Sequence, residues 1–375
     1  MYYIGIDLGT SAVKGLLIDE NGAVLRENSK TYPVFYPSDG WSEQNPEDWF
    51  FAVNRLIDEL SDGVEEKIAA LSVGGQMHGL VVLDENDNVV RPCILWNDGR
   101  TEKQTRYLNE VVGKEFLSEN TANIAFAGFT APKLLWIEEN EPENFKKIRK
   151  IMLPKDYIAY RLTGSFTTDF SDASGTLFLD VKNKCWSQKM LDILHIDRLM
   201  LPELKESYEV IGRIKDGFKL KGILVAAGAG DNAAAAIGTG ATTNGATNIS
   251  LGTSGTVFTS CDKFSVGENN SLHAFCHANG KYHLMGCILS AASANKWWIE
   301  DILKSEDYEG EVAFAKEKTG NNGVYFLPYL MGERSPHNDV NARGAFIGMR
   351  LDTSRQEMSL AVLEGVAFAL RDCVE

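Results

Sequence analysis

The sequence is poor in the features that mark several common classes of protein. Its 37 lysines and arginines are outnumbered by 52 aspartates and glutamates, so it lacks the basic surplus that neutralises a nucleic-acid backbone. No apolar run approaches the roughly 20 residues that a membrane-spanning helix needs. The start of the chain has no basic segment followed by an apolar one, so secretion is not expected. These absences argue against nucleic acid and membrane as partners.

Cysteine is also scarce, with six in 375 residues, and no two of them form a C-x-x-C pair. We therefore predict neither a disulfide framework nor a zinc site, and expect free thiols in a reducing cytoplasm. There is no low-complexity tract, and the hydrophobic share of 44% is that of an ordinary globular protein. A chain of this length is long for one compact core, which favours two domains.

The first forty or so residues predict a small antiparallel sheet. Residues 3–8 form a buried type of strand, a Gly-Thr-Ser turn follows at 9–11, and a return strand is expected at 13–19. Asn21-Gly22 is a signal for a two-residue hairpin loop, which predicts a third strand at 23–25.

The rest of the first half alternates helices and strands. A helix is predicted over 46–60, because Asn45 is a favoured N-cap and Pro46 suits the first helical position. The other predicted elements are buried strands at 69–75 and 222–228, a hairpin made of 81–83 and 89–92, a mostly helical stretch at 100–162, an alanine-rich helix after Asp231, and a helix from about Ser354.

The opening pattern returns in the second half of the chain. A strand at 247–251 is followed by a Gly-Thr-Ser-Gly turn at 252–255 and a return strand at 256–260. Repetition of a supersecondary unit carries more weight than either copy alone. We place the domain boundary just before the second copy, which gives domains at 1–243 and 244–375, each an α/β domain.

Both Gly-Thr-Ser turns offer backbone N–H groups and hydroxyls at one point, a pattern that suits phosphate oxygens. In the first turn the candidates are Thr10 and Ser11, with Lys14 as a nearby cation; in the second they are Gly252 and Thr253. A single turn of this kind also occurs in hairpins for purely geometric reasons. Two matching turns, one per domain, favour a polyphosphate held between them.

Two aspartates are candidates for the chemistry. Asp7 ends the first strand beside the turn, where a carboxylate can hold Mg²⁺; the alternative is an Asp that only bonds turn amides. Asp231 is the candidate base, because it follows a buried strand and the turn at 228–230. The alternative is a helix N-cap, and both roles can hold together. Phosphoryl transfer has a loose transition state, so a carboxylate that orients a hydroxyl suffices.

A cleft is expected after the strand at 69–75, because a Gly-Gly turn leads into Gln76-Met77-His78. The histidine can equally be an ordinary loop residue and the methionine ordinary packing. Trp96 precedes Asn97-Asp98 and is a candidate for stacking on a sugar; its alternative is a plain turn before a helix.

At these positions the sequence resembles the FGGY family of carbohydrate kinases. The similar segments are Ile-Gly-Ile-Asp-Leu-Gly-Thr-Ser at 4–11, Gly-Phe-Thr-Ala-Pro-Lys-Leu-Leu-Trp at 128–136, Gly-Asp-Asn at 230–232, and 344–348 through 361–364. The resemblance implies an α/β actin-like ATPase (ribonuclease H-like) fold, with two α/β domains around a cleft. It implies ATP and Mg²⁺ as cofactors and a small-molecule sugar as the other partner.

The resemblance also implies roles for single residues. Asp231 would be the proton acceptor and Asp7 would be needed for activity. Met77 and His78 would contact the sugar together with Asp231, Asn232 and Trp96. Thr253 would face the γ-phosphate, and Lys296 would contact the nucleotide.

Several loops look like those of family members that act on xylulose, at 41–44, 75–79, 95–100, 153–157 and 171–176. They imply D-xylulose as the acceptor and D-xylulose 5-phosphate as the product. The resemblance further implies a longer second domain with a glycine-rich adenine loop, so we expect this chain to be C-terminally truncated. A homodimer is kept as a candidate oligomeric state.

Two other classes of function remain open. Within the enzymes, the acceptor could be another ketose, a polyol or a sugar acid such as ribulose, glycerol or gluconate. Outside them, the chain could be a non-catalytic sugar- or nucleotide-binding protein on the same fold. The presence of both Asp7 and Asp231 counts against that reading, and the Met77-His78 cleft counts against an actin-like filament protein or chaperone.

Overall fold

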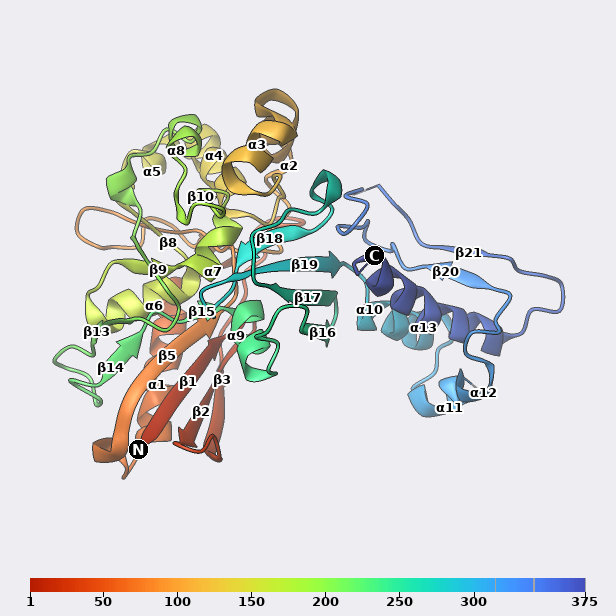
Figure 1. The fold of residues 1–375 in the computed structure, drawn as a ribbon, viewed down its shortest axis with the longest axis horizontal. Helices are drawn as coiled ribbons and strands as arrows, with labels where there is room; N and C mark the ends of the chain where they lie inside the picture. Colours follow the sequence, from red (N-terminus) through yellow and green to blue (C-terminus); the bar gives the residue numbers. More distant parts are fainter. Residues whose placement is uncertain (314, 340, 375) are drawn as a thin grey trace. The chain divides into compact units, whose positions relative to one another are not determined.

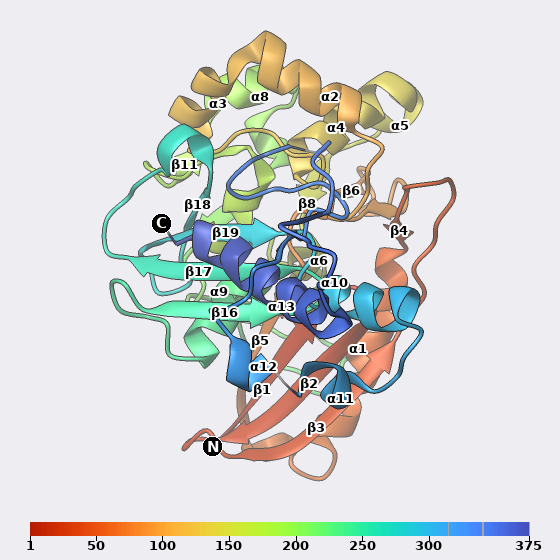
Figure 2. The same ribbon diagram turned by 90° about the vertical axis from the view of Figure 1, so that its right-hand side faces the viewer.

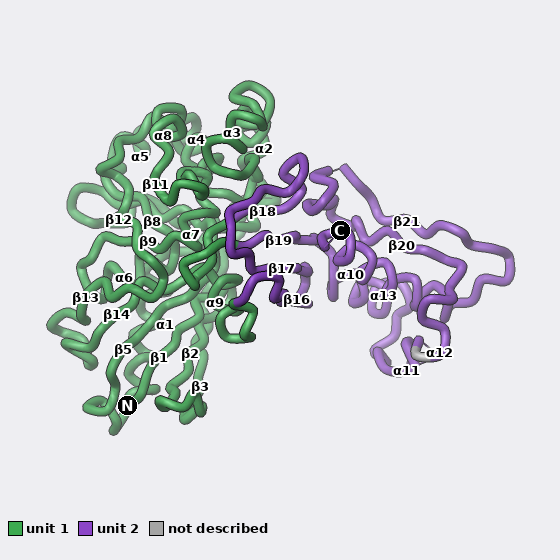
Figure 3. Tube along the Cα trace, viewed as in Figure 1, with its two compact units in different colours: residues 1–242, 275–282 green, residues 243–274, 283–375 purple. Residues whose placement is uncertain are grey.

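The computed structural model describes residues 1–313, 315–339 and 341–374, which fold into two compact units (Figures 1 and 3). Unit 1 comprises Met1–Thr242 and Phe275–Tyr282, and unit 2 comprises Thr243–Ala274 and His283–Glu375. No helix within the described ranges is both long enough and apolar enough to cross a bilayer. The six cysteines, all within those ranges, are free thiols.

Unit 1 is built on a mixed sheet with strand order β13-β14-β5-β1-β2-β3, and β15 also pairs with β5. β1 runs parallel to β5 and antiparallel to β2, and β14 and β15 run parallel to β5 on its other side. The strands of this sheet are β1 (Tyr2–Leu8), β2 (Ala12–Asp19), β3 (Val24–Thr31), β5 (Ile68–Gly75), β13 (Val210–Arg213), β14 (Leu224–Ala226) and β15 (Ala229–Gly230).

Helix α1 (Pro46–Ser61) covers β2 and β3, which Figure 2 shows beside β1. It begins as predicted, with the Asn45 side chain accepting a hydrogen bond from the Glu47 N–H and Pro46 at the first helical position. Its buried face includes Trp49 and Leu56. The helix lies so close to β2 that a Cβ on Gly15 would stand 2.9 Å from a Leu56 methyl carbon.

Smaller elements complete unit 1. The paired short strands are β4 (Glu43–Gln44) with β7 (Cys93–Ile94), β6 (Val81–Leu83) with β8 (Lys150–Met152), β9 (Thr167–Asp169) with β12 (Glu203–Lys205), and β10 (Leu179–Asp180) with β11 (Cys185–Trp186). The helices are α2 (Glu102–Arg106), α3 (Lys114–Thr121), α4 (Thr130–Asn140), α5 (Pro142–Phe145), α6 (Pro154–Thr163), α7 (Phe170–Ala173), α8 (Gln188–Ile193) and α9 (Asp231–Gly238), with shorter turns η1 (Glu65–Lys67), η2 (Tyr107–Gly113), η3 (Ser174–Thr176) and η4 (Arg198–Met200).

Unit 2 contains most of a four-stranded sheet of order β16-β17-β19-β18, whose β18–β19 loop belongs to unit 1. A second core forms where α13 packs on β20, and it includes Trp298, Phe326 and Val362. The elements are β16 (Thr247–Leu251), β17 (Gly255–Cys261), η5 (Glu268–Asn270), β18 (His273–Cys276), β19 (Tyr282–Ile288), α10 (Ala292–Lys296), η6 (Trp297–Ile302), α11 (Tyr308–Val312), α12 (Ala315–Lys318), β20 (Tyr325–Leu327), β21 (Ala345–Ile347) and α13 (Arg355–Asp372).

Two local predictions were wrong. The Asn21-Gly22 loop is not a two-residue hairpin, because Gly22 has a positive φ of 84° and Asn21 does not; the Asp19 N–H pairs with the Ala23 carbonyl, which makes the loop longer. Residues 89–92 do not form a strand. They meet β6 only in an isolated bridge from Leu83 to Val89 and one hydrogen bond from the Val90 N–H.

Candidate active site

Asp7 and Asp231 leave the unit 1 sheet at the same edge. β1, β5 and β15 run parallel, and Gly74 on β5 lies between Asp7 on one side and Ala229 on the other. The carboxyl ends of neighbouring parallel strands meet at one edge of a sheet, which is where α/β proteins bind ligands. Asp231 follows β15 directly and opens α9.

The environment of Asp231 raises its pKa. Burial raises its pKa to about 7, and the charge of Asp7 acts in the same direction. The backbone N–H and side-chain amide of Asn232 both donate to Asp231 Oδ1, at 2.7 and 3.0 Å, and lower the pKa in part. Desolvation also raises the pKa of Asp7, opposed by Lys14, its neighbour on β2. A carboxylate with a pKa near 7 is matched to proton transfer at neutral pH.

The interpretation of Asp231 as a helix N-cap is wrong in detail. Gly230 occupies the N-cap position, with an extended backbone, and Asp231 is the first residue of the helix. The helix N-terminus still favours the ionised carboxylate. The raised pKa of Asp231 therefore means that burial outweighs this effect.

Met77 and His78 lie in the loop after β5, between two glycine segments. The His78 backbone has a positive φ of 68°, and its Nδ1–H donates to the Gly175 carbonyl at 2.8 Å. A Cβ on Gly175 would stand 2.3 Å from the His78 ring, and one on Gly230 would stand 3.0 Å from Met77 Sδ. His78 also stacks on Phe129, with ring centroids 4.7 Å apart. The loop therefore packs between Gly175 and Gly230, the residue immediately before Asp231.

The Thr10 side chain is engaged by other side chains. Its hydroxyl accepts a hydrogen bond from Trp96 Nε1 at 2.9 Å and donates to Gln76 Oε1 at 3.2 Å. Gln44 Nε2 donates to the Thr10 carbonyl at 2.7 Å and Gln44 Oε1 accepts from Gln76 at 3.1 Å. The single hydroxyl proton of Thr10 is thus used within the protein. This leaves backbone amides and the exposed Ser11 as the part of the turn suited to phosphate.

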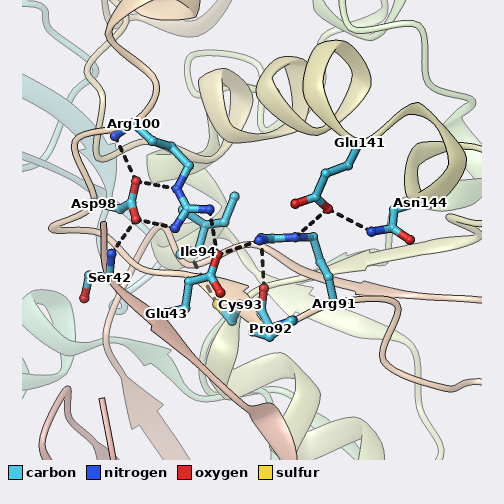
Figure 4. A network of polar contacts seen from close by, with 10 residues as sticks. All are labelled: Ser42, Glu43, Arg91, Pro92, Cys93, Ile94, Asp98, Arg100, Glu141 and Asn144. Atoms are coloured by element: carbon cyan, nitrogen blue, oxygen red, sulfur yellow. Dashed lines mark hydrogen bonds and ion pairs between the residues drawn. The ribbon is translucent and has the colours of Figure 1, made fainter. Parts of the chain in front are cut away.

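A charged network lies next to Gln44 and Trp96, two of the three residues that bind Thr10. Figure 4 shows Glu43 between two arginines, with its Oε1 2.6 Å from both Arg91 Nη2 and Arg100 Nη1. Arg100 also forms a two-pronged contact with Asp98, at 2.8 and 2.7 Å. Gln44 follows Glu43 directly and Trp96 lies two residues before Asp98. The network therefore adjoins, along the chain, two of the residues that bind the Gly-Thr-Ser turn of unit 1.

A second buried network lies beside Asp231. Lys155 is fully buried, and its Nζ lies 2.6 Å from Asp156 Oδ1, 2.9 Å from Asp169 Oδ1 and 3.8 Å from Asp172 Oδ2. Burial raises the pKa of Asp172, against the charge of Lys155, and the negative charge of Asp231 adds to the increase. Sequence reasoning did not assign these residues to the site. The acidic residues at 156, 169 and 172 were the available signal, but nothing in the sequence pairs them with Lys155.

The second Gly-Thr-Ser turn lies in unit 2, between β16 and β17, and is hydrogen-bonded to the start of α10. The Gly252 carbonyl accepts from the Ala292 N–H at 2.9 Å, and the Thr253 carbonyl accepts from the Ser293 hydroxyl at 2.7 Å. Lys296 is on the same helix, 3.8 Å from Glu300. Unit 2 thus brings Gly252, Thr253 and Lys296 to one region, and unit 1 holds the remaining predicted site residues.

Comparison with known proteins identifies the family. Residues 2–238 match the N-terminal domain of the FGGY family of carbohydrate kinases, and residues 247–375 match its C-terminal domain. The chain belongs to the FGGY family of carbohydrate kinases. Members of this family are phosphotransferases, and ATP is the phosphoryl donor that the family implies for this chain. The fold is therefore the two-domain α/β actin-like fold that was predicted.

Individual relatives are similar along the whole chain. A xylulose kinase of Lactococcus lactis is 43% identical over 381 residues, which cover 99% of this chain and 76% of that protein. Among solved structures, a ligand-bound xylulose kinase from Lactobacillus acidophilus has a TM-score of 0.94 at 31% identity, covering 100% of this chain and 77% of that one. A gluconate kinase from the same species has a TM-score of 0.94 at 32% identity, covering 99% and 77%. The chain thus spans about three quarters of the length of each of these three relatives.

Proposed function

We propose that this FGGY kinase transfers the γ-phosphoryl group of ATP to D-xylulose and forms D-xylulose 5-phosphate, with Asp231 as the proton acceptor. The observation that carries the chemistry is the pKa of Asp231, raised to about 7 by burial at the carboxyl edge of the sheet. The choice of sugar rests on relatives named xylulose kinase, one of them 43% identical.

Asp231 orients the sugar hydroxyl and takes its proton as the new oxygen–phosphorus bond forms and the bond to the ADP oxygen breaks. Little proton abstraction is required early, because the transition state of phosphoryl transfer is loose. The amide of Asn232 holds Asp231 Oδ1 at 3.0 Å, which orients the carboxylate for this step. We also propose that Asn232 contacts the sugar.

On the sugar side, His78 is oriented by its hydrogen bond to Gly175. Because the Gly175 carbonyl can only accept, Nδ1 carries a proton. We propose that the ring contacts a sugar hydroxyl. Met77 packs against Gly230 and links this loop to the base. Trp96 belongs to the same region, with its indole N–H bound to Thr10.

On the nucleotide side, the two Gly-Thr-Ser turns bind the phosphates, with Lys14 and Ser11 in unit 1 and Gly252, Thr253 and Lys296 in unit 2. Asp7 is the residue that would hold Mg²⁺, which neutralises phosphate charge when bound. Across residues 1–313, 315–339 and 341–374 no group of three or more His, Cys, Asp or Glu could hold a metal ion. Mg²⁺ is usually bound by one or two carboxylates, substrate phosphates and water, so the single carboxylate of Asp7 is a suitable ligand.

A coupled assay of ADP release with D-xylulose, ribulose, glycerol and gluconate tests the proposal. We expect the highest kcat/KM with D-xylulose. Gluconate is the second candidate, because the gluconate kinase structure is as similar in fold as the xylulose kinase one. A higher kcat/KM with gluconate than with D-xylulose would replace the sugar assignment.

We also propose a cytoplasmic location, and a homodimer as the assembly to test by light scattering.

A further inference from the structure

The four residues that lead into Asp231 are held by a buried polar network that no substrate role explains. Residues 227–230 join β14 to the candidate base, and β15 contributes only the two pairs Ala229–Gly74 and Gly230–Gly75. The network members come from elsewhere in unit 1 and are all nine-tenths or more buried: Lys155, Asp156, Asp169, Ser171 and Ser207.

The first chain of hydrogen bonds connects Asp169 to Gly230 through Ser171. The Ser171 hydroxyl donates to Asp169 Oδ2 at 2.5 Å, so its oxygen is turned to accept, and the Gly230 N–H donates to it at 3.1 Å. Gly230 is the residue immediately before Asp231. The carboxylate of Asp169 thereby sets the direction of the Ser171 hydroxyl and, through it, the position of the Gly230 amide.

Two further sets of polar contacts connect Asp169 to residues 227–230. The Ser207 hydroxyl donates to Asp169 Oδ2 at 2.7 Å, while the Ser207 carbonyl accepts from the Gly228 N–H at 3.0 Å. Lys155, ion-paired to Asp169 Oδ1 at 2.9 Å, also approaches the Ala227 carbonyl at 3.5 Å. Three of the four residues before Asp231 therefore depend on contacts organised by Asp169.

The segment is closely packed against its neighbours, so a shift in it is passed on to them. Gly228 has a positive φ of 79°, and a Cβ there would stand 1.9 Å from the Val73 carbonyl oxygen. Gly230 lies against the Met77 side chain. A shift of Gly230 would consequently move both the base and the loop that carries His78.

We propose that Asp169, acting through the Ser171 hydroxyl, is a positioning residue for Asp231. The inference rests on the proposed function, in that Asp231 is taken as the base. A buried ionic network is weak as a source of stability, since well-packed apolar residues do as well. A role in positioning Asp231 would explain the network, because a misplacement of about 1 Å lowers the rate of an oriented reaction by about 100-fold.

The test compares three variants of the full chain. Ser171→Ala removes the oxygen that holds the Gly230 amide, and Ser171→Thr keeps a hydroxyl in its place. Ser61→Ala is the matched control, because Ser61 is also fully buried and its hydroxyl donates to a carbonyl within α1, at 3.4 Å from Asp58 O. Each is assayed for kcat and sugar KM with D-xylulose, and for amide hydrogen exchange at residues 227–232.

We expect Ser171→Ala to lower kcat by about 10- to 100-fold with the sugar KM within about threefold of wild type. Exchange at Gly230 should quicken by about tenfold or more, since a lost amide hydrogen bond contributes on that scale. Ser171→Thr should lie nearer to wild type than Ser171→Ala, and Ser61→Ala should match wild type in both readouts.

Unchanged exchange at Gly230, a kcat loss no larger than that of Ser61→Ala, or a change in KM alone would each overturn the inference. If Ser171→Ala does not fold, the wild-type protein decides: fast exchange at Gly230 contradicts the hydrogen bond to Ser171 and slow exchange supports it. If the wild type phosphorylates no sugar, the proposed function fails, and the exchange comparison alone still decides whether the Ser171 hydroxyl, through which Asp169 is proposed to act, holds Gly230.

Discussion

Replacing Asp231 by asparagine should stabilise the protein while it abolishes turnover, and the gain should depend on pH. The pKa of Asp231 is raised from 3.8 to about 7 in the folded protein, mainly by burial. The folded state therefore binds the proton more tightly than the unfolded state. The ionised carboxylate destabilises the fold progressively as pH rises from about 4 to about 7, and the penalty is constant above that. Asparagine has the same shape and no such penalty.

The magnitude follows from the shift. A difference of about 3 pKa units at about 1.4 kcal/mol each gives an upper limit of about 4 kcal/mol at pH 8. Asp231 is only partly shielded from solvent, so we expect about 1–3 kcal/mol at pH 8 and under half of that at pH 5.

Urea unfolding of wild type and Asp231→Asn at the two pH values measures this, followed by tryptophan fluorescence. Asp58→Asn, at an exposed position on α1, is the control and should show no pH-dependent gain. An equal gain at pH 5 and pH 8, or a loss of stability at pH 8, would refute the electrostatic account of Asp231.

Three further predictions concern its neighbours. His78→Ala should raise the sugar KM by about tenfold or more with little change in the ATP KM, because a lost hydrogen bond to substrate contributes about 1–2 kcal/mol. Steady-state kinetics with both substrates varied measures this, and an unchanged sugar KM would show that His78 does not contact the sugar. Thr10→Val should lower the free energy of unfolding by about 1–3 kcal/mol, because the Trp96 and Gln76 groups lose their partner, whereas Thr10→Ser should lose much less; equal losses in urea unfolding would contradict the hydroxyl's role. Asp7→Asn should lower the pKa of Asp231, because the negative charge of Asp7 helps to raise that pKa; an NMR titration of the side-chain carboxyl carbons measures it. An unchanged or higher pKa would show that Asp7 does not influence the titration of Asp231.

Local signals in the sequence were sufficient for the main elements. Alternating apolar residues and the Gly-Thr-Ser turns predicted both hairpins, β1–β2 and β16–β17, and both formed. Helix α13 begins where Ser354 and Glu357 form a capping box, as its predicted start near Ser354 requires. The prediction of a strand at 89–92 was wrong because apolar character alone does not supply a partner strand. β6 pairs instead with β8, far along the chain.

The support of the site could not be predicted in the same way. Asp7 lies near the end of a recognisable strand, and Met77, His78 and Asp231 follow recognisable strands or turns. The sequence was therefore enough to predict that they lie at this end of the sheet. The Thr10 hydroxyl was expected to serve the nucleotide, yet its partners Trp96 and Gln76 lie 86 and 66 residues away. The contact between Lys155 and Asp169 likewise depends on the packing of α6 against β9. Single-residue patterns carry no information on such pairings.

The most direct measurement is a ³¹P NMR time course of the full chain with ATP, Mg²⁺ and D-xylulose, run beside Asp231→Ala. The account predicts that the wild type converts the γ-phosphate of ATP into the phosphomonoester of D-xylulose 5-phosphate, and that Asp231→Ala forms none while still binding the sugar in a calorimetric titration. Sugar phosphate formed by Asp231→Ala at the wild-type rate, or none formed by a wild type that binds both substrates, would contradict it.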